Sequence, residues 1–253
     1  MVLSRPPASS FPEEWYDLAT DDHFWMEWRL QAFLRQLLDL GAPMSAPWKG
    51  LDIGCGAGVV CGQLEGRSAW TLDGADLNEK ALRLNGPRKG RVLLYDIHDR
   101  RPELASAYDF LLLFDVIEHI DDVHGYLDSA LYHLRPGGWL FVNVPALEAL
   151  RSAYDSAAGH LRRYDGGTIA ATFSRHALEL RDVRYWGASL IPLLLLRTLW
   201  TSEGAPVAET LKKGFQPPHP AVNAALRSLC RIETRLTTHP IAGTSLLAAA
   251  VKR

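Results

Sequence analysis

Between residues 50 and 144 the chain alternates short apolar runs with segments of helical periodicity, and this alternation restricts the fold more than any other feature. The run at 110–114 is almost wholly apolar, as expected of a strand buried on both faces of a sheet. Repeated strand–helix units predict a parallel sheet with right-handed crossovers and helices on both sides. The strands expected in this part cover residues 51–53, 70–75, 91–95, 110–114 and 139–144, and the helix after the second strand is expected to have Asn78 as its N-cap.

Two further strands are expected at 180–186 and 245–251, which brings the doubly wound sheet to seven strands. The segment between them is too long for a simple hairpin loop. This insert (188–243) contains an apolar segment at 190–200, a Gly/Pro-rich stretch at 204–220 and an amphipathic helix. The apolar residues of that helix are expected to face inward; they are Val222, Leu226, Leu229, Ile232 and Leu236.

The residues ahead of the first strand form a second part of the chain. Residues 1–13 carry Pro and Ser and are expected to form a loose leader. Aromatic and aliphatic side chains recur at helical spacing over 22–40, and Gly41 and Pro43 end that pattern. We therefore divide the chain into a leader with a helical cap (1–48) and one α/β domain (49–253).

Charge and composition narrow the classes of partner. The 27 Lys and Arg residues nearly balance the 29 Asp and Glu residues, which gives a net charge of -2 without a long basic run. Tight binding to a phosphate backbone needs a basic face, so nucleic acid is not expected as a partner. The 3 cysteines include no Cys-x-x-Cys pair, which argues against a disulfide framework or a cysteine-rich zinc site and favours a reducing cytoplasm.

The chain also lacks the usual marks of secretion and membrane insertion. Its first residues are polar and interrupted by proline, unlike a signal peptide. The longest apolar run, 190–196, is far shorter than a bilayer span, so no transmembrane segment is expected, although peripheral membrane contact stays open. No feature of the sequence indicates an oligomeric state.

Small and acidic residues gather where the expected strands end, which is where an open parallel sheet binds ligands. Gly54 and Gly56, after the first strand, allow a sharp turn and a close approach of the backbone to a ligand. Asp76 ends the second strand and can accept hydrogen bonds from both hydroxyls of an adenosyl ribose. Asp96 follows the third strand and can receive an adenine amino group, with Ile97 against the ring. A glycine-rich turn alone is also typical of nicotinamide dehydrogenases.

Six successive segments resemble the class I S-adenosylmethionine (SAM)-dependent methyltransferases, in particular the small-molecule group called type 11 or type 12. The segments are HFWMEWR (23–29), LDIGCGAG (51–58), GADLNEKAL (74–82), YDFLLLFDVIEHIDD (108–122), HLRPGGWLFVNVPA (133–146) and GHLRRYD (159–165). The resemblance covers roughly residues 15–187 and the closing GTSLLAAAVKR (243–253). It implies the Rossmann-like methyltransferase fold, with an antiparallel last strand, SAM as cofactor and S-adenosylhomocysteine as product.

The resemblance also implies a set of cofactor contacts at the ends of the first four strands. These are Asp52, Gly54 and Gly56 for the methionine moiety, Asp76 and Leu77 for the ribose, Asp96 and Ile97 for the adenine, and Phe114 beside the sulfonium. The segment after the fourth strand lacks the Asn/Asp-Pro-Pro-aromatic motif of enzymes that methylate DNA bases, which disfavours base methylation. The acidic cluster of metal-dependent catechol methyltransferases is also missing, so an essential Mg²⁺ ion is not expected.

Three residues are candidates for catalysis. His119 has an ordinary pKa of about 6.5, which suits a general base, or else Glu118 and His119 cap the next helix and shape the SAM pocket. His160 lies in the loop after the fifth strand, which faces the acceptor in this fold, and would act as a base or as a hydrogen-bond partner of the substrate. Tyr164 is expected to point into the same space.

Three further residues are candidates for substrate binding. Arg162 and Arg163 could hold an anionic group of the acceptor through the guanidinium fork. Alternatively, one of these arginines braces the loop by pairing with Glu118 or Asp165. Trp25 is expected either to contact the acceptor from the cap or to belong to the core.

The expected reaction is an in-line transfer of methyl from SAM to a small-molecule, lipid-linked or glycan-linked acceptor, with O-methylation favoured. The alternatives are N- or C-methylation of a natural-product intermediate, a different reaction of a SAM-binding enzyme with the same fold, and a non-catalytic SAM-binding module. SAM would occupy the first half of the sheet. We therefore expect the acceptor between the cap, the loop around 154–165 and the insert at 188–243, which would cover it.

Overall fold

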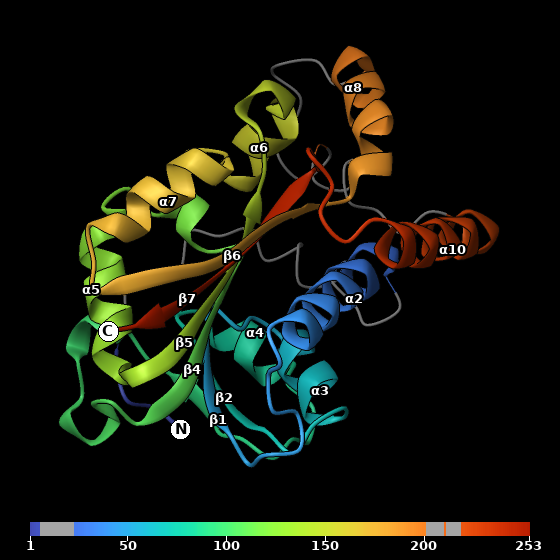
Figure 1. Ribbon diagram of the computed structural model, residues 1–253. Helices are drawn as coiled ribbons and strands as arrows, with labels where there is room; N and C mark the ends of the chain where they lie inside the picture. Colours follow the sequence, from blue (N-terminus) through green and yellow to red (C-terminus); the bar gives the residue numbers. More distant parts are fainter. Residues whose placement is uncertain (6–22, 201–209, 211–218) are drawn as a thin grey trace.

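A seven-stranded mixed sheet forms the centre of the computed structural model (Figure 1). The structure describes residues 1–5, 23–200, 210 and 219–253. The strand order is β3-β2-β1-β4-β5-β7-β6, and β7 is antiparallel to both neighbours, which confirms the predicted fold. The strands are β1 (Lys49–Ile53), β2 (Thr71–Asp76), β3 (Val92–Leu94), β4 (Tyr108–Phe114), β5 (Leu134–Pro145), β6 (Leu178–Trp186) and β7 (Ser245–Lys252).

Helices cover both faces of this sheet (Figure 1). The apolar sides of α2 and α3 pack on one face, with α10 against α2, and those of α5 and α7 pack on the other. The α-helices are α2 (Phe24–Asp39), α3 (Val59–Glu65), α4 (Glu79–Arg83), α5 (Val123–His133), α6 (Ala153–Ala158), α7 (Gly166–Ser174), α8 (Ile191–Trp200) and α10 (Pro220–Leu236). The short 3₁₀ helices are η1 (Ile97–Asp99), η2 (Pro102–Leu104), η3 (Ile117–His119), η4 (Glu148–Leu150) and η5 (Ala188–Leu190).

Local sequence explains several boundaries of these elements. The apolar residues of β4 are buried because the strand is central in the sheet, between β1 and β5, and helices cover both faces there. The side chain of Asn78 accepts a hydrogen bond from the backbone N–H of Ala81, which confirms the predicted N-cap. β5 begins earlier than expected because Leu134 pairs with Tyr108 ahead of a register shift.

The first five residues lie along β3, contrary to the expected loose leader. Leu94 donates its N–H to the carbonyl of Met1, and its own carbonyl accepts from Leu3, each at 2.9 Å. The side chain of Ser4 is buried. The expectation is wrong for these residues because the outer edge of β3 offers backbone groups that need partners. Residues 6–22 of the leader and cap lie outside the described part.

The apolar face of α10 is mostly exposed, so the expectation that it faces inward is wrong. Ile232 and Leu236 are 54% and 80% exposed, and Val222 and Leu229 are also exposed. Only Leu226, of the five, packs against the core, beside the buried Cys230. Ion pairs from Arg227 and Arg231 to Glu27 of α2 set this rotation, because a helix that is tied by its polar side cannot also bury its whole apolar stripe.

The insert is only partly described. The Gly/Pro-rich stretch falls almost wholly on residues outside the described part. Among the helices that are described, none is long and apolar enough to cross a membrane.

Candidate functional site

A cavity of about 630 Å³ opens at the carboxyl ends of the parallel strands, next to the point between β1 and β4 where the strand order reverses. Its size is that of a small-molecule site. Every residue predicted to contact the cofactor lines this cavity. These residues are Asp52, Gly54, Gly56, Asp76, Leu77, Asp96, Ile97 and Phe114.

The conformation of the loop after β1 depends on its glycines. Gly54 and Gly56 have φ angles of 78° and 52°, in the left-handed region. A Cβ atom on Gly54 would come within 2.6 Å of the side chain of Val116. The N–H of Gly56 donates to Oδ2 of Asp76 at 2.7 Å, so the loop and the end of β2 are held together.

Two carboxylates line this part of the cavity, the buried Asp52 and the half-buried Asp76. Burial raises the pKa of Asp52 to about 6, although Cys61 donates a hydrogen bond to it and Arg88 and Arg29 are nearby. Burial likewise raises the pKa of Asp76, whose oxygens accept backbone N–H groups, those of Gly56 and Asn78 among them. Carboxylates in this condition favour a ligand that brings positive charge or hydroxyl donors.

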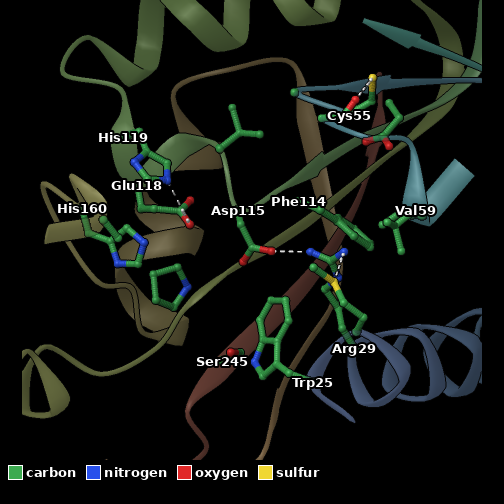
Figure 2. Close-up of a pocket in the computed structure, with 18 of the residues that line it drawn as sticks. Trp25, Arg29, Cys55, Val59, Phe114, Asp115, Glu118, His119, His160 and Ser245 are labelled. Carbon is green, nitrogen blue, oxygen red and sulfur yellow. Dashed lines mark hydrogen bonds and ion pairs between the residues drawn. The ribbon is translucent and has the colours of Figure 1, made fainter. Parts of the chain in front are cut away.

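An ion pair joins the cap to the end of β4, and the sequence analysis did not foresee it. The guanidinium Nη1 of Arg29 lies 2.5 Å from Oδ2 of Asp115 (Figure 2). Asp115 has a φ angle of 58°, unusual for a residue with a side chain, and Asn143 donates to its other oxygen at 2.7 Å. Arg29 also lies over the ring of Trp25, 4.9 Å from its centre. The segment HFWMEWR contained the signal, because it ends in this arginine.

The loop after β5 is braced by Asp155. Nδ1 of His160 donates to Oδ1 of Asp155 at 2.8 Å, and Nε of Arg163 donates to the same oxygen at 2.8 Å. Although burial acts in the opposite direction, these partners hold the pKa of Asp155 well below its usual range. Arg163 is therefore committed to the loop, with Asp155 in place of the expected Glu118 or Asp165.

Two other predicted contacts lie away from the cavity. Tyr164 is buried in the core, where its hydroxyl donates to the carbonyl of Ile117 at 3.3 Å. Arg162 donates to the carbonyl of Asp121 at 3.2 Å. Neither residue lines the cavity, and the expectation that Tyr164 points into it is wrong. The chain turns between His160 and Tyr164, and β-like pairing of Tyr164 with Ala146 directs its side chain into the core.

Glu118, His119 and His160 converge at the other half of the cavity, which Figure 2 shows on the far side of Asp115 from Cys55. Burial, with the charge of Asp115 added, raises the pKa of Glu118 well above its usual range. Burial, together with the charge of His160, lowers the pKa of His119 to about 4. The two imidazole rings lie 4.9 Å apart, edge to face.

Apolar residues of the cap and the insert complete this half. Trp25 of α2 lines the cavity, as one of its two sequence interpretations expected. The insert contributes side chains from η5, α8 and α10. These are Leu190, Leu193, Leu194, Val222 and Leu226.

Residues 23–183 match the profile of the family described as "Methyltransferase domain". The chain belongs to this family. The match confirms the prediction of a class I SAM-dependent methyltransferase and of SAM as its cofactor.

Curated methyltransferases match the chain over part of its length. A ubiquinone biosynthesis O-methyltransferase of Thiobacillus denitrificans is 30% identical over 113 residues, which are 42% of this chain and 48% of that protein. The protein of the same name in Sinorhizobium medicae is 32% identical over 125 residues, 47% of this chain and 50% of that protein. The chain thus spans about half the length of these relatives.

Solved structures share the methyltransferase fold. A chain from the complex between the Haloferax volcanii Trm112 methyltransferase activator and a methyltransferase superimposes with a TM-score of 0.60 at 16% identity, covering 94% of this chain and 96% of that one. Phosphoethanolamine N-methyltransferase 2 of Haemonchus contortus, solved with SAM, gives a TM-score of 0.54 at 18% identity, covering 92% of this chain and 57% of that one. At such identities the likeness supports the fold alone.

Proposed function

We propose that this protein transfers the methyl group of SAM to a hydroxyl group of a small, largely apolar acceptor. One observation carries the proposal: a single cavity joins two chemically different halves. One half is the glycine loop with its two carboxylates, and the other is an apolar wall that ends in the cluster of Glu118, His119 and His160.

The first half has groups that fit SAM. The buried carboxylate of Asp52 would pair with the ammonium of the methionine moiety. Asp76 would also bind the ribose hydroxyls, because a carboxylate has about four lone-pair positions and those of Asp76 are not all taken by the backbone N–H groups of Gly56, Leu77 and Asn78. SAM supplies a methyl group that its sulfonium already activates, so the chain mainly aligns the acceptor and excludes water.

The second half fits an acceptor with an apolar body and a hydroxyl group. Leu193, Leu194 and Leu226 offer an apolar wall, while the titratable groups lie together at one end. A neutral amine needs little help from such groups, whereas a hydroxyl must lose its proton. The ubiquinone biosynthesis O-methyltransferases among the relatives support the same choice of acceptor atom.

The transfer forms one bond to the methyl carbon and breaks another. A lone pair of the acceptor oxygen forms the new bond to the methyl carbon, while the electrons of the breaking carbon–sulfur bond pass to sulfur, which loses its positive charge. The hydroxyl proton passes from the acceptor to water. Glu118, His119 and His160 are the groups placed to promote that loss.

The test compares matched acceptors. Phenols with an apolar chain and the corresponding anilines are incubated with methyl-labelled SAM, and products are weighed by mass spectrometry. We expect the phenols to gain one methylene and the anilines to remain mostly unchanged. Methylation of the anilines alone would instead favour N-methylation.

A variant pair tests the assignment of the cluster. His160→Ala should lower turnover at least about tenfold, a barrier change of roughly 1.4 kcal/mol, while SAM affinity is nearly retained. His239→Ala removes an exposed histidine and should behave as the wild type. If His160→Ala turns over as fast as His239→Ala, His160 does not activate the acceptor.

A further inference from the structure

Three side chains with metal-ligating atoms meet at the acceptor end of the cavity. Glu118 and His119 lie on η3 after β4, and His160 lies in the loop after α6 (Figure 2). One ligand atom from each lies within 4.8 Å of the others. Oε1 of Glu118 is 4.0 Å from Nε2 of His119.

Both imidazoles are held in the tautomer that leaves Nε2 for a metal ion. Nδ1 of His119 donates to the carbonyl of Gly159 at 3.2 Å, and Nδ1 of His160 donates to Asp155 at 2.8 Å. A neutral ring that donates through Nδ1 carries its lone pair on Nε2. A carbonyl or carboxylate behind the ring is also the usual second layer of a metal site, where it fixes the ligand's orientation.

Glu118 provides a second, independent observation. Its side chain is 0% exposed, and neither carboxylate oxygen has a hydrogen-bond partner among the described residues. Buried charges in proteins are normally paired, hydrogen-bonded or bound to a metal. The guanidinium of Arg29 is already bound to Asp115, and that of Arg163 to Asp155. The environment of Glu118 is therefore suited to a cation from outside the chain.

The geometry points to a binding site for one divalent transition-metal ion, held by Glu118, His119 and His160. Two imidazoles and one carboxylate favour zinc, iron or a similar ion over Mg²⁺, which prefers oxygen ligands. All three residues line the cavity, so the coordination positions left open would face the acceptor. The sequence analysis expected no essential Mg²⁺ and did not anticipate a histidine-rich site.

Binding requires a modest approach of the three side chains. Nitrogen ligands lie about 2.0–2.1 Å from a tetrahedral zinc ion, so two ligand atoms on one ion are roughly 3.3–3.4 Å apart. The present spread of 4.8 Å therefore has to shrink by about 1.5 Å. His160 lies in a loop and His119 ends a single 3₁₀ turn, which can adjust more easily than a central strand.

The ion's role toward the acceptor rests on the proposed function, whereas the binding of the ion does not. An acceptor oxygen in an open position would form a bond to the ion and release its proton to water. The release is favoured because a bound divalent ion lowers the pKa of its ligand.

The experiment measures metal binding directly, without SAM or acceptor. The full chain is stripped with chelator and titrated with Zn²⁺ by calorimetry, and Co²⁺ is added in parallel as an absorption probe of nitrogen ligation. We expect one ion per chain and a Co²⁺ spectrum typical of nitrogen and oxygen ligands. Failure of the wild-type protein to bind either ion at micromolar concentration would overturn this proposal. It would not overturn the proposed methyl transfer, which is tested by a separate assay.

Variants assign the ligands. Glu118→Gln and His160→Ala should each weaken Zn²⁺ binding at least tenfold, and Asp155→Asn, which acts through His160, should weaken it about 10–100-fold. His239→Ala should bind as the wild type does. Retained SAM affinity shows that a variant is folded. If the folded Glu118→Gln and His160→Ala proteins bind Zn²⁺ as tightly as the wild type does, the proposed site is wrong. The Co²⁺ spectrum of the wild-type protein tests the site without any variant.

Discussion

At the residue scale, the buried and half-buried carboxylates divide into two groups. Asp155 is surrounded by donors from His160 and Arg163, which hold its pKa well below the usual range although burial opposes them. Asp52, Asp76 and Glu118 lack such compensation, and burial raises the pKa of each. The compensated carboxylate braces a loop, whereas the uncompensated ones line the cavity. We therefore expect Asp52, Asp76 and Glu118 to act on ligands, and Asp155 to act on structure.

The first prediction concerns Asp76. Asp76→Ala should weaken SAM binding by roughly 1.5–3 kcal/mol, because hydrogen bonds to a charged group are lost. Calorimetry with SAM measures the change. Glu79→Ala serves as the control, since Glu79 is exposed on the neighbouring helix and pairs only with the exposed Arg83 among described residues. Unchanged affinity in the Asp76 variant would remove this residue from the ribose site.

The second prediction concerns stability and pH at Asp73 of β2. Although burial opposes it, hydrogen bonds from Arg91 and Tyr108 lower the pKa of Asp73. A carboxylate with a lowered folded-state pKa stabilises the protein above its unfolded pKa of about 3.9 and loses that contribution as the pH falls through the folded value. Asp73→Asn should therefore cost about 1.5–3 kcal/mol at neutral pH.

Urea denaturation near pH 7 and below pH 4 tests this dependence on charge. The difference in unfolding free energy between wild type and Asp73→Asn should shrink at the acidic pH. If this difference in unfolding free energy is the same at both pH values, the effect of the substitution does not depend on the charge of Asp73. Asp109→Asn, at a partly exposed site, is the control for effects of acidic pH that do not depend on Asp73.

At the scale of elements, the sequence predicted the strands better than the contacts of helices and loops. Buried parallel strands such as β4 appear as apolar runs, and their order follows from the strand–helix alternation. The periodicity of α10 identified an apolar stripe but not what it contacts, because Glu27 holds its polar side. The meeting of Glu118 with His160 depends on how two separate loops fold back, which no local pattern records.

The third prediction concerns the junction between α10 and the start of the insert. Oε1 of Glu233 accepts the N–H of Gly187 at 2.8 Å and of Ala188 at 3.0 Å, and Oε2 accepts that of Ser189 at 2.8 Å. Glu233→Ala removes these acceptors and should cost about 0.5–2 kcal/mol, the range for a lost helix cap. Hydrogen exchange at 187–189 should become faster.

Glu233→Gln is the matched control for this junction. It keeps one carbonyl acceptor and should give an intermediate exchange rate. Unaltered exchange in Glu233→Ala would show that the carboxylate does not hold the insert.

At the scale of the whole molecule, the cavity draws on nearly every part of the described chain. The cap, the ends of β1, β2 and β4, the loop after β5 and the insert all contribute side chains to its lining. The sequence motifs identified the half expected to bind the cofactor, because each of its residues lies at or just after the end of one strand. In the rest of the cavity, His119, His160 and Trp25 were named from the sequence, but the pairing of Arg29 with Asp115 was missed.

The fourth prediction concerns partners. With a net charge of -2 and no long basic run, the protein should not bind nucleic acid tightly. Fluorescence anisotropy with labelled duplex DNA and tRNA at about 0.15 M salt measures this. We expect no binding in the sub-micromolar range, and salt-sensitive binding in that range would contradict the prediction.

The position of β7 has a consequence for how the protein is made. β7 is the last of the seven strands to be synthesised, yet it lies between β5 and β6 and is their common partner. While the ribosome adds residues in order, β6 emerges without any strand beside it, and the edge of β5 stays open. The half of the sheet from β3 to β5 can form early, but the remainder must wait for the final strand. Nascent chains are therefore most open to wrong pairing after β6 has emerged and before β7 has.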